Sequence, residues 1–131
     1  MVLVIACVLV IIAALIHVAI FWMESVAWTR PAIWARFNVA DQAQADSNRD
    51  LAFNQGFYNL FLAFGAVTGV VLLAAGLHAA GYALVFLSVG SMLAASVVLL
   101  SLGTKFAAAA LTQGLAPLIA LIVTVIACTT V

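Results

Sequence analysis

The sequence predicts an all-α integral membrane protein, a four-helix antiparallel bundle forming a single domain over residues 1–131. Hydrophobic residues make up 69% of the 131 residues and charged residues only 6%, which is more apolar surface than a water-soluble domain of this length can bury. Four apolar stretches each reach the roughly 20 residues that a helix needs to cross the hydrocarbon core. The last three stretches are joined by tight turns, which make neighbouring helices antiparallel.

Each apolar stretch is expected to be helical, because backbone groups have no water partner inside a bilayer. The four stretches cover about 2–23, 51–76, 79–102 and 106–130. The first has no basic region before it and is longer than the apolar part of a typical signal peptide, so we expect it to be retained.

The first connection, residues 24–50, contains seven of the eight charged residues and is expected to hold a short helix on the membrane surface. Thr29 would cap this helix, and Pro31 would be its second residue. Its apolar side would comprise Ile33, Trp34 and Phe37, with Arg30 and Arg36 toward water.

Two further patterns mark the ends of the first connection. Ser47 stands three residues before Asp50, a spacing typical of a capping box at the start of the second long helix. Trp22, Trp28 and Trp34 fit an aromatic belt at one membrane interface.

Charge predicts the orientation in the membrane. Arg30, Arg36 and Arg49 lie in the first connection and Lys105 in the last turn, so all four basic residues fall on one side. The other side, with both termini and the turn around His78, has none. The positive-inside rule therefore predicts a multi-pass protein of the bacterial cytoplasmic (inner) membrane with both termini outside. His78 is expected to be a plain surface residue.

Small residues predict close helix packing. The sequence "GAVTG" places Gly65 and Gly69 in a GxxxG pattern on the second helix. On the third helix the same spacing recurs in the pairs Gly90 with Ala94 and Ser91 with Ala95. These faces predict packing within the bundle, and a homo-oligomer is a further expected partner.

Cys7 and Cys128 lie near the two ends of the chain, each inside an apolar stretch. They are expected to be small packing residues rather than a disulfide framework. A bridge between them stays open, because both would lie in the same leaflet.

Polar residues inside the apolar stretches are the most informative positions, because burying them in lipid is costly. His17 lies about six residues before the inner end of the first stretch, roughly 9 Å into the hydrocarbon core. Glu24 follows two helical turns later, at the interface. Residues at this spacing share one helix face, and Trp28 continues the same stripe.

The second and fourth stretches bring polar residues to a similar depth. Asn54 and Gln55 come one turn into the second stretch, and Tyr58 and Asn59 about 10–12 Å in. Gln55, Tyr58 and Asn59 are spaced to lie on one helix face. Gln113 lies roughly 10 Å into the fourth stretch. We therefore predict a polar pocket in the cytoplasmic half of the bundle.

The expected ligand-binding residues are His17, Glu24, Trp28, Asn54, Gln55, Tyr58, Asn59 and Gln113, and the candidates for acid–base catalysis are His17 and Glu24. Pro117, one turn after Gln113, is expected to kink the fourth helix and free the Gln113 carbonyl group. Each polar residue also has a structural interpretation. His17 could bond across the bundle, Glu24 could pair with Arg30 or meet lipid headgroups, and the amides could only hold helices together.

Other classes of function lack support in the sequence. The net charge of zero gives no sign of nucleic-acid binding. There is no nucleophile elbow, phosphate-binding loop or dinucleotide fingerprint. His17 and Glu24 alone make a weak metal signal, because zinc sites use three or four protein ligands. No metal site is predicted, and the cofactor stays unknown, since nothing favours His17 as a haem ligand.

The blocks "ALIHVAIFWMESVAW", "NQGFYNLFLA" and "QGLAPLIAL" resemble, in order, the signature blocks of a bacterial family of small four-helix membrane proteins. This family is catalogued as domain of unknown function 1304, and the resemblance covers essentially the whole chain. Its blocks map onto His17, Glu24, Trp28, Asn54, Gln55, Tyr58, Asn59, Gln113 and Pro117. The resemblance implies a four-helix inner-membrane protein and brings no established activity with it.

Three functions remain open. The first is binding or transport of a small, partly apolar ligand, with Glu24 and His17 as the proton-linked or ligand-contacting pair. The second is an intramembrane enzyme, such as an isomerase, with His17 or Glu24 as acid or base and Tyr58 and Asn59 polarising an oxygen. The third is a structural or assembly subunit of a membrane complex. The first is preferred, with membrane lipid and a small molecule as the expected partners.

Overall fold

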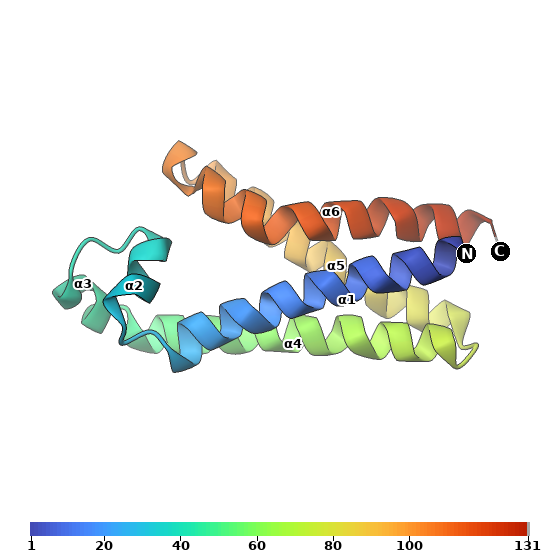
Figure 1. The fold of residues 1–131 in the computed structure, drawn as a ribbon, viewed down its shortest axis with the longest axis horizontal. Helices are drawn as coiled ribbons and strands as arrows, with labels where there is room; N and C mark the ends of the chain where they lie inside the picture. Colours follow the sequence, from blue (N-terminus) through green and yellow to red (C-terminus); the bar gives the residue numbers. More distant parts are fainter. Residues whose placement is uncertain (131) are drawn as a thin grey trace.

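The computed structural model describes residues 1–130 and consists of four long helices packed side by side, as Figure 1 shows. The long helices are α1 (Val2–Phe21), α4 (Arg49–Ala74), α5 (His78–Ser101) and α6 (Ala107–Thr129). A π-helical turn, Trp22–Val26, continues α1. All four are long and apolar enough to cross a membrane. The predicted all-α four-helix bundle is confirmed.

The helices form a ring in which α1 and α5 each pack against both α4 and α6. Figure 1 shows both termini and the α4–α5 turn at one end, which we call the terminal end. The first connection and the α5–α6 turn lie at the other end, which we call the loop end. This is the antiparallel arrangement that the tight turns predicted.

The α4–α5 turn is a Schellman motif, which explains why it is so short. The Leu77 N–H donates to the Leu72 carbonyl at 2.9 Å and the Gly76 N–H to the Leu73 carbonyl at 3.1 Å. Gly76 has a φ of 81°, a left-handed conformation that favours glycine. His78 begins α5 and is exposed, with its ring stacked on Tyr82 at 6.3 Å between centroids.

The GxxxG pattern joins α4 to α5. A Cβ atom on Gly69 would come within 2.8 Å of Val85 Cγ2 and 3.1 Å of the Gly81 carbonyl oxygen, and one on Gly65 would overlap Ser88 Oγ. The predicted role of Gly65 and Gly69 in packing the bundle is confirmed.

The small residues of α5 behave differently. A Cβ atom on Gly90 would meet nothing within 4 Å, and Ala94 and Ala95 are exposed. These residues face outward, so a homo-oligomer through this face stays a prediction. Cys7 is half-buried, Cys128 is exposed, and both are free thiols.

A continuous apolar core fills the middle and the terminal half of the bundle. Its buried members are Val10, Ala13, Ala14, Ala63, Ala66, Leu73, Tyr82, Val85, Val89, Met92 and Ala120. All four long helices contribute to it. Pro117 is buried inside α6, and Figure 1 shows that α6 changes direction between its ends, in keeping with the predicted kink.

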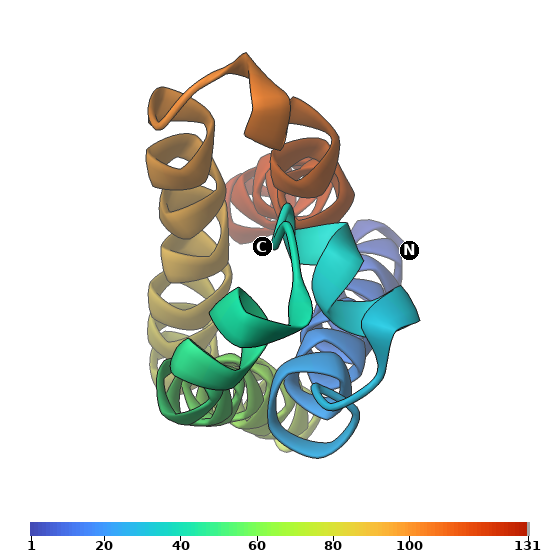
Figure 2. The ribbon, with the colours of Figure 1, turned by 90° about the vertical axis from the view of Figure 1, so that its left-hand side faces the viewer.

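The first connection folds into two short helices, α2 (Pro31–Trp34) and α3 (Gln42–Ser47), with a 3₁₀ turn at Ala35–Phe37. Figure 2, which faces the loop end, shows these elements in front of the bundle, over the ends of α1 and α4, with the α5–α6 turn standing clear of them. They have a small core of their own, made by Trp28, Val39, Ala45 and Ala52 with Trp34 and Phe37 against it. A bond from Asn38 Nδ2 to the Lys105 carbonyl, 3.4 Å, joins the connection to the α5–α6 turn.

The predicted surface helix exists, with its apolar residues half-buried and its arginines exposed. Its predicted cap is wrong, because Arg30 is the N-cap and Thr29 lies outside the helix. Pro31 is the first residue rather than the second, a position that suits the fixed φ of proline and its missing N–H.

The capping box predicted at Ser47 is also wrong. Ser47 is the last residue of α3, and α4 begins at Arg49 without a side-chain cap. The cap lies earlier, where Asp41 Oδ1 accepts from the Gln44 N–H and Gln44 Oε1 accepts from the Ala40 N–H, both at 2.8 Å. These two bonds start α3.

The three tryptophans have different surroundings. Trp22 is 43% exposed, with the Arg30 guanidinium 5.5 Å from its ring centroid, and Trp34 is half-buried. Trp28 is only 7% exposed and its Nε1 donates to the Ala45 carbonyl at 2.9 Å. Trp28 therefore belongs to the core of the first connection rather than to a lipid-facing belt.

Candidate ligand-binding site

The candidate site begins with the π-helical turn at the loop end of α1. The Ala27 N–H donates to the Trp22 carbonyl at 2.9 Å, a bond that spans one residue more than an α-helical bond. Such wide turns recur at functional sites. Here the turn carries Glu24, whose side chain is only 8% exposed.

Glu24 is paired with an amide on the neighbouring helix. Its Oε2 atom accepts a hydrogen bond from Asn59 Nδ2 at 2.9 Å, and Asn59 Nδ2 also donates to the Gln55 carbonyl at 3.2 Å. Asn59 is 9% exposed. A buried carboxyl group needs such a partner, because leaving it without a hydrogen bond is costly.

A glycine lets the two helices approach closely enough for this pair. A Cβ atom on Gly56 would overlap Ser25 Oγ and lie 3.1 Å from both Glu24 Cβ and the Phe21 carbonyl oxygen. Ser25 Oγ in turn donates to the Phe53 carbonyl at 2.8 Å. The π-helical turn is therefore held against the first turns of α4 by main-chain and side-chain contacts.

A cavity of about 260 Å³ opens beside this contact, and we call it the loop-end cavity. Its lining residues are Glu24, Ser25, Val26, Trp28, Thr29, Arg49, Asp50 and Phe53. Glu24 Oε2 accepts the bond from Asn59, whereas Oε1 accepts no hydrogen bond from residues 1–130 and is not among their buried unpaired atoms. One carboxyl oxygen thus holds the structure together and the other is free for a ligand.

The charged groups that line the cavity do not form ion pairs with one another within residues 1–130. Arg49 and Asp50 are exposed and begin α4. Within residues 1–130, neither forms a hydrogen bond through its side chain, and no ion pair joins them to Glu24. The pairing of Glu24 with Arg30, one structural interpretation of the sequence, is likewise not formed.

The structure brings some of the predicted site residues together. Glu24 and Asn59 form a hydrogen bond, and Trp28 shares the cavity wall with Glu24. Trp28 reaches this wall from beyond the end of the helix, not along the stripe that the sequence suggested. Gln55 takes part through its backbone carbonyl alone.

The other predicted residues lie elsewhere. His17 is 1% exposed, and its Nδ1 bonds to the Ala13 carbonyl of its own helix at 2.9 Å. His17 lines neither the loop-end cavity nor the apolar hollow between α1 and α4 that is described below. The side chains of Asn54, Gln55 and Tyr58 are exposed, and Gln113 is half-buried on α6.

The burial pattern of α4 explains this separation. Its buried positions at the loop end are Ala52, Gly56, Asn59 and Ala63, which follow one stripe of the helix. Tyr58 lies outside this stripe and is 54% exposed. Tyr58 and Asn59 therefore do not point into one cavity.

The sequence prediction did not include six residues of the cavity, namely Ser25, Val26, Thr29, Arg49, Asp50 and Phe53. One feature of the sequence could have indicated Arg49 and Asp50 as site residues. This charged pair stands two to three helical turns before Asn59 on the same helix. Charges at the start of a membrane-spanning helix lie at the level where Glu24 leaves the membrane.

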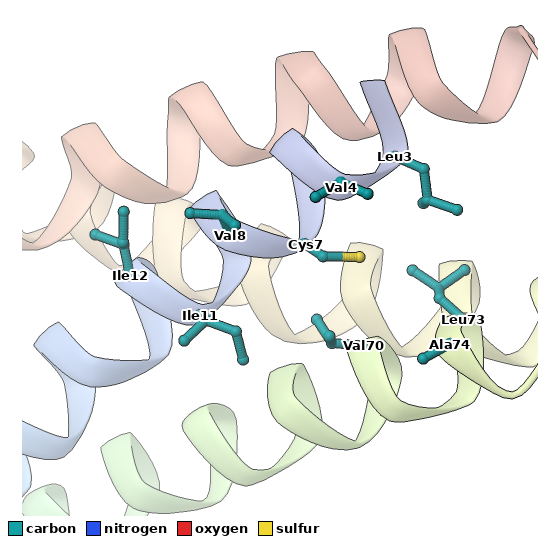
Figure 3. Close-up of a pocket in the computed structure, with 9 residues that line it drawn as sticks. All are labelled: Leu3, Val4, Cys7, Val8, Ile11, Ile12, Val70, Leu73 and Ala74. Carbon is teal, nitrogen blue, oxygen red and sulfur yellow. The ribbon is translucent and has the colours of Figure 1, made fainter. Parts of the chain in front are cut away.

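A second hollow of about 440 Å³ runs between α1 and α4 in the terminal half, as Figure 3 shows. Its lining is apolar apart from the Cys7 thiol, with residues such as Val4, Ile11, Val70 and Leu73. The hollow lies on the outer face of the bundle among lipid-facing residues, where lipid acyl chains would fill it. Apart from the Cys7 thiol it offers no polar group that would orient a ligand.

No group of three or more His, Cys, Asp or Glu residues within residues 1–130 could hold a metal ion. No cofactor is assigned to the loop-end cavity, whose polar groups include two carboxyl groups, a guanidinium and two hydroxyls.

Replacing Asn59 by leucine should destabilise the protein by about 2 kcal/mol, because the buried Glu24 carboxyl then loses its partner. Chemical denaturation in detergent measures the change. The double variant Asn59→Leu with Glu24→Leu should be less destabilised than Asn59→Leu alone, because both polar groups are then removed together. Strictly additive effects would show that the two side chains do not interact.

Comparison with known proteins gives one match. The family model described as "Protein of unknown function (DUF1304)" matches residues 11–125. No curated protein and no solved structure matches the chain significantly. The matched range includes every residue of the loop-end cavity as well as His17 and Gln113.

Proposed function

The chain belongs to the DUF1304 family, and from the geometry of its loop-end cavity we propose that it binds a small, partly apolar ligand there. The free Glu24 Oε1 atom carries this proposal, because a buried carboxyl group that lines a cavity and has one oxygen without a hydrogen bond can accept one from a ligand. Trp28 and Phe53 supply apolar wall, as small-molecule sites usually have.

The packing supports binding more than passage through the bundle. Beyond the Glu24–Asn59 pair the interior is mostly apolar, with His17, Ser88, Ser96 and Thr124 as buried polar side chains, and His17 does not line the loop-end cavity. The assumed proton-linked pair of a transporter or enzyme therefore lacks support. An oxygen-polarising pair of Tyr58 and Asn59 lacks it too, because Asn59 bonds to Glu24 and Tyr58 is exposed.

We place the loop-end cavity on the cytoplasmic side of a bacterial inner membrane. All four Lys and Arg residues lie at the loop end, in the first connection or the α5–α6 turn. The positive-inside rule assigns that end to the cytoplasm. The cavity is then open to ligands from the cytoplasm and from the inner leaflet.

Trp28 offers a direct test, because it is the one tryptophan in the cavity wall. In the variant Trp22→Phe with Trp34→Phe it is the only tryptophan left. The probes are 2-phenylethylammonium, 3-phenylpropionate and phenylalanine, which share a phenylalkyl skeleton and differ in charge. At least one probe should shift the Trp28 emission of the purified protein in a saturable way.

Two substitutions decide whether such a signal comes from the cavity. Thr29→Phe places a ring in the cavity wall and should abolish the saturable shift. The matched control Thr112→Phe adds the same ring to an exposed threonine of α6 and should leave it unchanged. The proposal fails if no probe gives saturation, or if Thr29→Phe leaves the response intact.

A further inference from the structure

The charges of the loop-end cavity define the kind of ligand that would complement it. Glu24 and Asp50 supply two carboxyl groups and Arg49 one guanidinium, all lining the same cavity. No ion pair within residues 1–130 satisfies any of the three. Charges of both signs that leave one another unpaired are complementary to a ligand that also carries both signs.

The position of the cavity indicates where the ligand comes from. Glu24 lies in the last turn of the first membrane-spanning segment, Val2–Val26, and Arg49 begins the second, Arg49–Ala74. The cavity therefore straddles the boundary between hydrocarbon and headgroups. Two of its lining residues, Val26 and Phe53, are 61% and 52% exposed, which is typical of side chains that face lipid.

We infer that the loop-end cavity binds the headgroup of a zwitterionic phospholipid whose ammonium nitrogen carries hydrogens, of the phosphoethanolamine type. Arg49 would contact the phosphate, for which a guanidinium fork is suited. Glu24 Oε1 and the Asp50 carboxylate would accept hydrogen bonds from the ammonium group. The acyl chains would leave the cavity past Val26 and Phe53. This inference rests on the proposed function and names its ligand class.

The same residues discriminate against other headgroups. A phosphoglycerol headgroup has no ammonium, so the Glu24 and Asp50 carboxylates would lack a donor of opposite charge. A quaternary ammonium keeps its charge but has no N–H to donate to Glu24 Oε1. The ring of Trp28 attracts either kind of cation, so the hydrogen bonds, rather than the charge alone, set the preference.

The test is a titration of the single-tryptophan protein in detergent with short-chain lipids that differ only in the headgroup. Dihexanoyl phosphatidylethanolamine should bind about tenfold more tightly than the phosphatidylglycerol analogue, the ratio expected for one charge-assisted hydrogen bond. The phosphatidylcholine analogue should fall between them. Free phosphoethanolamine should bind more weakly than the lipid, because it lacks the acyl chains.

Variants assign the two halves of the headgroup. Asp50→Asn should weaken the phosphatidylethanolamine analogue and leave the phosphatidylglycerol analogue nearly unchanged. Arg49→Gln should weaken both by a similar factor, because both carry the phosphate. The control Arg36→Gln, an exposed arginine of the first connection outside the cavity, should change neither.

The outcomes separate this inference from the proposed function. Equal or tighter binding of the phosphatidylglycerol analogue would overturn the role of the carboxylates. Equal binding of free phosphoethanolamine would overturn the lipid as the source. If the phenyl probes bind and none of the lipids does, the inference fails while the proposed function stands. If no probe and no lipid binds, both fail.

Discussion

Replacing Trp28 by alanine should release the first connection from the end of the bundle, at a cost of about 3–5 kcal/mol in the free energy of unfolding. The indole is 7% exposed and lies in the small core with Val39, Ala45 and Ala52. It also packs against Phe37, with ring centroids 5.4 Å apart. The substitution removes both this packing and the bond to the Ala45 carbonyl.

Limited proteolysis measures this release directly. Arg36 is exposed just after α2 and is followed by Phe37, so trypsin should cleave the Trp28→Ala variant after Arg36 faster than the parent protein. The control is Trp22→Ala, because Trp22 is 43% exposed and lies outside the small core. Equal cleavage of the two variants would mean that Trp28 does not hold the first connection in place.

Replacing Gly56 by leucine should separate the π-helical turn from α4 and cost about 3 kcal/mol, the upper part of the range for overpacked sites. The first atom of the new side chain already conflicts with Ser25 Oγ, and the Phe21 carbonyl oxygen beside it belongs to the main chain. A main-chain atom cannot rotate away, so the helices themselves have to move apart. The Glu24–Asn59 bond spans this contact and should break with it.

Gly90→Leu is the matched control, because a Cβ atom there meets nothing within 4 Å. Thermal unfolding in detergent should show a lower midpoint for Gly56→Leu and little change for Gly90→Leu. The Trp28 signal with the phenyl probes should also be lost in Gly56→Leu, since Glu24 lines the cavity. Similar midpoints for the two variants would contradict the close contact.

The long helices could be predicted from the sequence because lipid imposes them. An apolar run of this length has to satisfy its own backbone groups, so hydropathy places α4, α5 and α6 within about two residues of their observed ends. The π-helical turn could not be predicted in this way. The wider turn adds one residue to the helical repeat at the end of α1, and no feature of the local composition indicates where this happens.

The candidate site could be predicted only in part. Counting residues along each helix placed Glu24 at the interface and Asn59 about 10–12 Å into the core, near the depth of His17, whereas the structure joins Glu24 to Asn59 by a hydrogen bond. Direction around the axis normally follows from apolar periodicity, but in a membrane both the core side and the lipid side are apolar. The sequence therefore could not distinguish the buried Asn59 from the exposed Tyr58 beside it.

The sequence by itself determined that the chain forms four membrane-spanning helices, that adjacent ones run antiparallel, and that the charges gather at one end. These features depend on the length and polarity of local segments, which lipid selects without reference to other parts of the chain. Only the tertiary structure decided that Arg49 and Asp50 share a cavity with Glu24, and that Trp28 closes its wall. These contacts join segments far apart in the chain, and they depend on close approach at Gly56 and on the rotation of each helix about its axis.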